Sequence, residues 1–121
     1  MGNHTIEKIG GTSMSRFGEV MNNVIIGSRQ GAELYNRVFV VSAYSGITNL
    51  LLEDKKTGEP GVYGHIARDN KNWPEALEKV RERMLEYNRS FEGIGLNVAD
   101  ADRFVNERID AVRECLKYIT F

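Results

Sequence analysis

The stretch Arg37-Val38-Phe39-Val40-Val41-Ser42 decides the fold class. Its four central residues form an uninterrupted apolar run, which is typical of a strand covered on both faces, as in a parallel sheet. A shorter strand is predicted at residues 4–9, and Gly10 and Gly11 end it. Two parallel strands need a crossover between them, and this crossover is usually helical. The chain is therefore predicted to be an α/β protein.

The crossover helix is predicted from apolar residues that recur every three or four positions: Met14, Phe17, Met21 and Val24. Thr12 or Ser13 offers the N-cap oxygen, and the helix should end near Gly27. Residues 28–36 are predicted to be a polar connection. A short helix over residues 47–53 and a weak helical segment over residues 62–69 flank a loop at residues 55–61.

Two long helices are predicted in the C-terminal part of the chain. The first begins at Asn72, with Pro74 in its first turn, and the second begins at Asn97 or Asp100. Their apolar rows are Leu77, Val80, Met84, Tyr87 and Phe91 in the first, and Phe104, Val105, Ile109, Val112, Leu116 and Ile119 in the second. The short linker predicts an antiparallel hairpin.

Only two strands are predicted, whereas a parallel sheet usually has more and is covered on both faces. The chain also stops on apolar residues at a helix end, Tyr118 to Phe121. We therefore expect residues 1–121 to be the N-terminal part of a larger α/β domain. The alternative is a small α+β domain that closes its sheet edges by dimerising.

Composition excludes several function classes. Sixteen basic and seventeen acidic residues give a net charge of −1, which does not suit binding to nucleic acid or to an anionic membrane. The single cysteine, Cys115, excludes an internal disulfide and is predicted to be a small buried hydrophobe. No apolar run is long enough to span a bilayer. Neither a secretion signal nor a set of metal ligands is predicted. A cytoplasmic protein is expected.

Two turns carry the chemistry, and we refer to them as the first turn (residues 8–13) and the second turn (residues 42–48). If the strands run parallel, both turns lie at the carboxyl edge of the sheet, where open α/β sheets bind ligands. In the first turn, a lysine, two glycines and two hydroxyls could hold a phosphate. The alternatives are structural: a glycine bend with a capping hydroxyl, and helix capping by the serines of the second turn.

Both turns resemble motifs of one family. Lys8-Ile9-Gly10-Gly11-Thr12-Ser13 resembles the lysine, apolar residue, Gly-Gly-Thr-Ser signature that opens aspartate kinases, which are members of the amino-acid kinase family. Val40-Val41-Ser42-Ala43-Tyr44-Ser45-Gly46-Ile47-Thr48-Asn49 resembles their second motif. Ile9 and Tyr44 replace the usual phenylalanine and methionine, and neither change removes a polar group. Residues 4–14 and 55–63 look like the subgroup associated with ectoine synthesis.

The resemblance implies ATP-dependent phosphorylation of the side-chain carboxylate of L-aspartate, the first step toward lysine, threonine and methionine. Lys8 would be catalytic and would bind ATP together with Gly10, Gly11 and Thr12. Ser42 and Thr48 would contact aspartate.

The resemblance also implies an amino-acid-kinase-type parallel sheet sandwiched by helices, and Mg²⁺ held mainly by the phosphates and by residues outside this chain. Residues 1–121 alone are expected to be inactive, and a homo-oligomer is compatible with the sequence. A function from another class remains open, namely a non-enzymatic helical module that associates through the apolar rows of the two long helices. The two turns discriminate, because such a module has no reason to bring them together.

Overall fold

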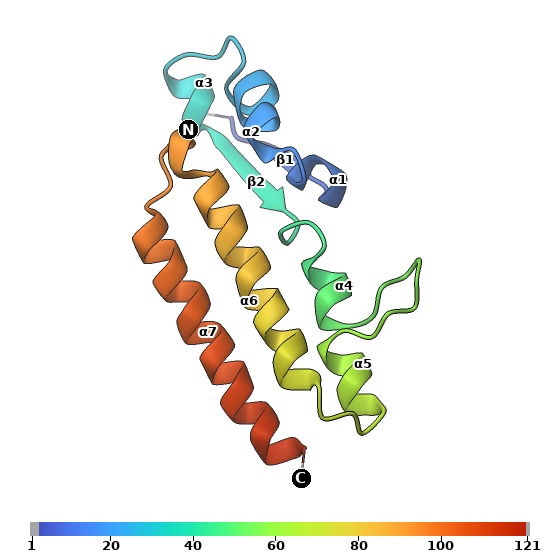
Figure 1. Cartoon of the computed structure of the whole chain (residues 1–121). Helices are drawn as coiled ribbons and strands as arrows, with labels where there is room; N and C mark the ends of the chain where they lie inside the picture. Colours follow the sequence, from blue (N-terminus) through green and yellow to red (C-terminus); the bar gives the residue numbers. More distant parts are fainter. Residues whose placement is uncertain (1–2, 121) are drawn as a thin grey trace. The chain divides into compact units, whose positions relative to one another are not determined.

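The computed structural model describes residues 3–120, which fall into two compact units, one up to Ser45 and the other from Gly46 onward. The first unit holds the two strands and the crossover between them, and the second holds the long helices (Figure 1). Within the described residues, no helix combines the length and the apolar character needed to cross a membrane.

The first unit is built on β1 (Thr5–Ile9) and β2 (Arg37–Val41), which pair in parallel with Ile9 opposite Val41. The predicted parallel arrangement is therefore confirmed. Among residues 3–120 these two strands form the only sheet, so each strand has a single neighbour. The apolar run of β2 predicts cover on both faces, and this prediction is wrong: Val38 and Val40, on one face, are each about half exposed, at 50% and 52%.

The crossover differs from the single predicted helix. It consists of α1 (Gly11–Met14), α2 (Phe17–Val20) and a π-helix, η1 (Met21–Ile26), with a break at residues 15–16. Gly27 ends the last of these with a φ of 52°, which agrees with the predicted end and favours glycine. The predicted polar connection contains α3 (Ala32–Tyr35), a single helical turn.

The second unit is helical. It contains α4 (Ile47–Leu51), α5 (Val62–Ala67), α6 (Trp73–Ser90), the short 3-10 helix η2 (Glu92–Ile94) and α7 (Val98–Ile119). α6 and α7 lie side by side and run antiparallel, and α4 and α5 pack against α6 (Figure 1). The predicted C-terminal hairpin is confirmed.

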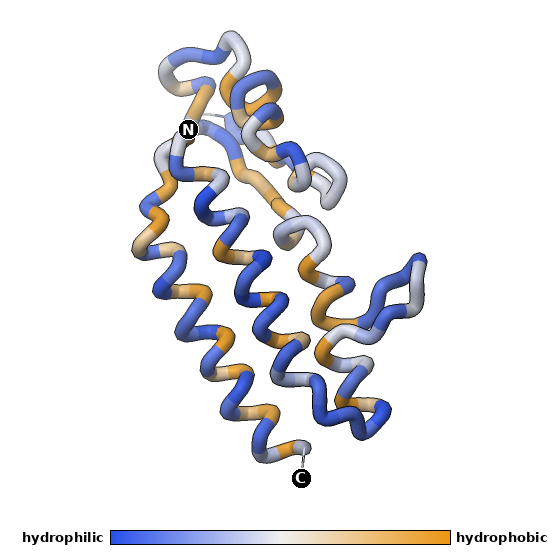
Figure 2. The backbone as a smooth tube through the Cα atoms, viewed as in Figure 1, coloured by the Kyte–Doolittle hydropathy of each residue, from blue (hydrophilic) through white to orange (hydrophobic). Residues whose placement is uncertain are grey.

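The core of the second unit includes the contact between the long helices. Leu77 and Val80 of α6 are 0% and 1% exposed, and Val105 and Ile109 of α7 are also buried. Apolar residues recur along both helices in Figure 2. The predicted row on α7 is too wide, because three of its members lie outside the contact with α6 and are exposed: Phe104, Val112 and Ile119.

Polar contacts fix how the two long helices meet. Asn88 is 1% exposed and donates a hydrogen bond to the carboxylate of Asp102, with 2.9 Å between Nδ2 and Oδ1. Arg81 donates to Asn106 at 2.9 Å and to Asp110 at 2.5 Å. Because an unpaired buried amide is costly, the Asn88 contact specifies one alignment of the helices.

Only one of the predicted helix caps forms as expected. Asn97 caps α7, since its side chain accepts from the backbone N–H of Asp100 at 3.1 Å. Asn72 occupies the N-cap position of α6 without a side-chain hydrogen bond. The prediction that Thr12 or Ser13 caps the crossover helix is wrong, because the N-cap of α1 is Gly10 and both residues lie inside the helix.

Gly61 is the tightest glycine of the second unit. A Cβ built there would lie 2.3 Å from the carbonyl oxygen of Leu50, a backbone atom that cannot rotate away. We expect Gly61→Ala to lower the free energy of unfolding by about 1–3 kcal/mol, the usual cost of overpacking. Gly93→Ala is the matched control, since a Cβ there meets nothing within 4 Å. Chemical denaturation measures both, and equal stabilities would contradict the expectation.

Candidate functional site

The first turn joins the end of β1 to α1. Gly10 follows the strand with extended backbone, φ −74° and ψ 171°, and its carbonyl accepts from the N–H of Met14 at 3.0 Å. The N–H groups of Gly11, Thr12 and Ser13 lie in the first helical turn, where a helix supplies no acceptor of its own. Because α1 has only four residues, these N–H groups, rather than a helix dipole, would provide most of any attraction for an anion.

The two glycines of this turn are not required by the fold. Gly10 has a negative φ, and a Cβ built at Gly10 or Gly11 would meet nothing within 4 Å. Their missing side chains therefore leave the backbone open on the outside of the turn. A ligand could approach the N–H groups closely there, which suits the phosphate of the sequence prediction.

Lys8 and Ser42 both lie at the carboxyl edge of the strand pair. Lys8 is opposite Val40 in the parallel register, and alternation places Ser42, two residues further on, on the same face. The N–H of Ser42 donates to the carbonyl of Ile9 at 3.1 Å, so the pairing continues to the start of the second turn. Lys8 is exposed and forms no ion pair with any described residue. The predicted convergence of the two turns at one edge is confirmed for these residues.

The second turn leads from β2 into α4. The N-cap of α4 is Gly46, whose φ of 85° is a conformation that favours glycine, and not Ser45 as the capping alternative predicts. Thr48 is exposed in the first turn of α4 and belongs to the second unit, so its contact with aspartate stays a prediction. Tyr44 is half-buried, and burial raises the pKa of its hydroxyl, which keeps the group neutral.

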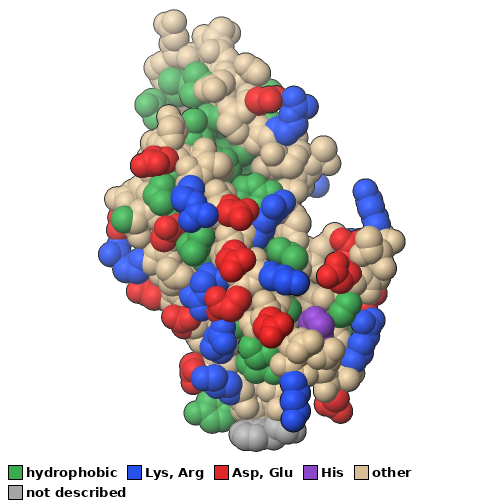
Figure 3. Space-filling model, in the orientation of Figure 1, with side chains coloured by type: hydrophobic (Ala, Val, Ile, Leu, Met, Phe, Trp, Pro, Cys, Tyr) green, Lys and Arg blue, Asp and Glu red, His purple; other side chains and the backbone are tan. Residues whose placement is uncertain are grey.

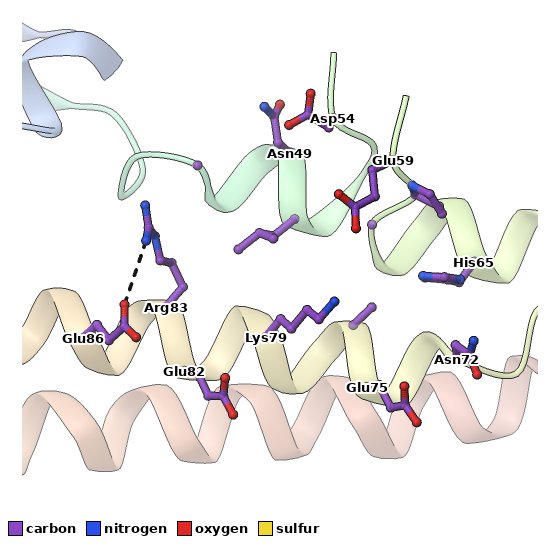
Figure 4. A pocket seen from close by; sticks show the side chains of 15 residues that line it. Asn49, Asp54, Glu59, His65, Asn72, Glu75, Lys79, Glu82, Arg83 and Glu86 are labelled. Carbon is purple, nitrogen blue, oxygen red and sulfur yellow. Dashed lines mark ion pairs between the residues drawn. The ribbon is translucent and has the colours of Figure 1, made fainter. Parts of the chain in front are cut away.

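The second unit also contains a cavity of about 750 Å³ between α4, the loop that follows it, α5 and α6 (Figure 4). Lys79 and Arg83 extend from α6 toward α4, and Glu59 reaches toward them from the loop. Arg83 pairs with Glu86 at 3.9 Å. Asp54 accepts the backbone N–H groups of Thr57 and Lys56, which lower the pKa of its carboxyl.

The charge of this cavity does not suit a phosphate. Its lining has one lysine and one arginine against five carboxylates: Asp54, Glu59, Glu75, Glu82 and Glu86. Acidic and basic side chains are interspersed on this side of the molecule (Figure 3). His65 lines the cavity with a buried Nδ1 that has no hydrogen-bond partner. The first turn is therefore the better candidate for binding a triphosphate.

Among the described residues, the first turn contains neither a candidate metal site nor a cysteine. Within residues 3–120, no group of three or more His, Cys, Asp or Glu side chains is arranged to hold a metal ion. The hydroxyls and N–H groups at the turn suit phosphate oxygens. The prediction that Cys115 is buried is wrong: it is exposed, because α7 turns that side away from α6.

The sequence prediction missed an ion pair between the two strands. Arg37 and Glu7 lie on neighbouring strands and form two hydrogen bonds of 2.5 Å, from Nε to Oε2 and from Nη2 to Oε1. The Arg37 side chain is only 3% exposed. A charged residue at the start of an apolar strand was the available signal, but the strand register was needed to identify its partner.

The hydrogen bonds from Arg37 lower the pKa of Glu7 from 4.5 to about 2. A carboxyl whose pKa is lower in the folded state contributes stability that is complete above the unfolded pKa and lost as the pH falls through the folded one. We therefore expect this contribution to decline from about pH 4.5 and to vanish below about pH 2. Comparing acid unfolding of the wild type and Glu7→Gln measures it, and parallel stability–pH curves over that range would contradict it.

The chain as a whole is similar to a known aspartate kinase. The chain is 58% identical, over 115 residues, to the aspartate kinase Ask_Ect of Stutzerimonas stutzeri (strain A1501). The match covers 93% of this chain and 24% of that kinase, so the chain spans about a quarter of its relative's length. No protein-family profile and no solved structure matches the chain. The resemblance to aspartate kinases is confirmed over nearly all of the chain.

Proposed function

We propose that residues 1–121 are the N-terminal part of the catalytic domain of an aspartate kinase. The complete protein transfers the γ-phosphoryl group of ATP to the side-chain carboxylate of L-aspartate and forms 4-phospho-L-aspartate. One observation carries the proposal: Lys8 and Ser42, from two motifs about thirty residues apart, share one face at the carboxyl edge of a parallel strand pair. A helical association module gives no reason for this convergence.

Lys8 would act on the charge that moves in the reaction. Phosphoryl transfer spreads negative charge over the equatorial oxygens and the leaving group, and an exposed ammonium beside the N–H groups of Gly10 and Gly11 can neutralise it. Thr12 adds a hydroxyl donor to the same turn. Ser42 and Thr48 would hold the aspartate so that its carboxylate can attack the phosphorus in line, without a covalent enzyme intermediate.

The same proposal includes the setting of the reaction. Mg²⁺ would be held mainly by the phosphates of ATP and by residues outside this chain. The similarity to Ask_Ect and the loop at residues 55–63 support the subgroup associated with ectoine synthesis. We place the protein in the cytoplasm and leave its oligomeric state open.

A hydroxylamine trap tests the function directly. The complete protein is incubated with ATP, Mg²⁺ and L-aspartate, and the acyl phosphate is captured as its hydroxamate. Product is expected with aspartate and not with L-asparagine, which lacks the carboxylate nucleophile. Residues 1–121 alone should form none. A complete protein that is folded but gives no aspartyl hydroxamate would refute the proposal.

Thr48→Val tests the substrate role of the second turn. The change keeps the shape of the side chain and deletes one hydroxyl, so we expect the KM for aspartate to rise by the equivalent of about 0.5–1.5 kcal/mol while kcat changes little. Thr57→Val is the matched control, because Thr57 lies in the loop of the second unit, outside both turns. Steady-state kinetics decides, and an unchanged KM for aspartate would remove Thr48 from the site.

A further inference from the structure

We propose that Glu7 and Arg37 form a positioning pair that holds Lys8 at the place where it acts on the phosphoryl group. This inference rests on the proposed function, because it assigns the pair a part in the same reaction. Both side chains lie on the face of the strand pair opposite Lys8. The pair would act through the backbone of β1.

The guanidinium of Arg37 connects three elements of the first unit. Two of its N–H groups hold the carboxylate of Glu7 on β1, and Nη1 donates to the carbonyl of Ile25 in the π-helix η1. The guanidinium also lies over the ring of Phe39, 4.6 Å from its centre. The pair therefore joins β1, β2 and the end of the crossover that begins at the first turn.

Because side chains alternate along a strand, the contact between Glu7 and Arg37 lies on the opposite face of the strand pair from Lys8. Glu7, Arg37 and Phe39 lie on one face of the strand pair, and Lys8 lies on the other face, opposite Val40. Glu7 precedes Lys8, so holding the Glu7 side chain fixes the orientation of the peptide from which Lys8 projects. Thr5 also donates to Glu7 Oε2, at 2.9 Å, and further restrains this carboxylate.

Stability alone does not account for an ion pair with a buried arginine at this place. Burying an arginine carries a large desolvation cost, and apolar residues of similar volume are often equally or more stabilising. What an ion pair with two parallel hydrogen bonds adds is a fixed geometry. In a site whose rate depends on the position of one ammonium group, that geometry has a function, since a displacement of about 1 Å can cost on the order of a hundredfold in rate.

Kinetics of the complete kinase tests the pair. We expect Glu7→Gln and Arg37→Lys to lower kcat, per mole of folded enzyme, by about tenfold to a hundredfold, while the KM values for aspartate and ATP stay within about twofold. Glu19→Gln is the matched control. It breaks the ion pair with Arg16 in the same unit, whose side chains are 69% and 63% exposed, and should leave kcat unchanged.

An apolar replacement separates positioning from stability. In the double variant Glu7→Leu/Arg37→Met, packing can restore the thermal stability that the single variants lose, but it cannot restore the fixed geometry. A stable double variant with low kcat supports the inference. Wild-type kcat in that variant, or in Glu7→Gln, overturns it. A wild-type enzyme that forms no aspartyl phosphate would instead refute the proposed function. The activity of the wild type is therefore measured before that of any variant.

Discussion

Replacing Lys8 by alanine is expected, under the proposed function, to lower the kcat of the complete kinase by about 10²–10³, with a much smaller change in the KM for aspartate. The negative charge that Lys8 would neutralise is greatest in the transition state, so its loss affects turnover more than binding. The exposed position of Lys8, free of ion pairs with other described residues, leaves its ammonium available to a bound ligand.

Two variants control this experiment. Lys56→Ala removes an exposed lysine from the loop of the second unit and should leave kcat unchanged. Lys8→Arg keeps the charge but changes its shape, so it should recover only part of the lost rate. If Lys8→Ala turned over like the wild type while the complete kinase was active, the first turn would not be the phosphate site.

The sequence was sufficient to predict the elements whose signals are local and strong. The apolar run before Ser42 predicts β2, and the glycines at residues 10–11 end β1 where the structure ends it. The periodic apolar residues of α6 and α7, with a short linker, predict their antiparallel contact. In each case several neighbouring residues favour the same conformation, so local preference and the final packing agree.

The crossover shows where local pattern fails. Its apolar residues have the spacing of one helix, yet the chain breaks at residues 15–16 and then winds as a π-helix. Of that predicted row only Met14 is buried. Phe17 and Met21 are half-buried and Val24 is exposed, so burial decreases along the row, and helical spacing alone does not specify a continuous helix.

The candidate site, like the fold, could be predicted from the sequence only in part. Parallel pairing follows from the crossover, so the meeting of Lys8 and Ser42 at one edge could be predicted. The contact of Glu7 with Arg37 could not, because it depends on a register in which Thr5 is opposite Arg37. A shift of one residue would move Glu7 to the other face, and nothing in the composition of β1 selects one register over the other.

The second large effect is expected from a charge placed in the helical hairpin. Val80 is 1% exposed on α6, where α7 and α4 both pack. Val80→Asp leaves a carboxylate without a partner in an apolar contact, which costs about 3–5 kcal/mol. Native proteins are stable by only about 5–15 kcal/mol, so the variant should be largely unfolded or should melt far below the wild type. Ile109→Asp, 6% exposed on the facing helix, should behave alike.

Val112→Asp is the control that makes this prediction specific. Val112 belongs to the apolar row that the sequence predicts on α7, but it is 42% exposed and does not lie in the contact with α6. The same chemical change on the same helix should therefore cost little, within about 0.5 kcal/mol. Thermal unfolding followed by circular dichroism compares the variants. If Val112→Asp were as damaging as Ile109→Asp, the side of α7 that carries Val112 would be buried as well, contrary to its 42% exposure.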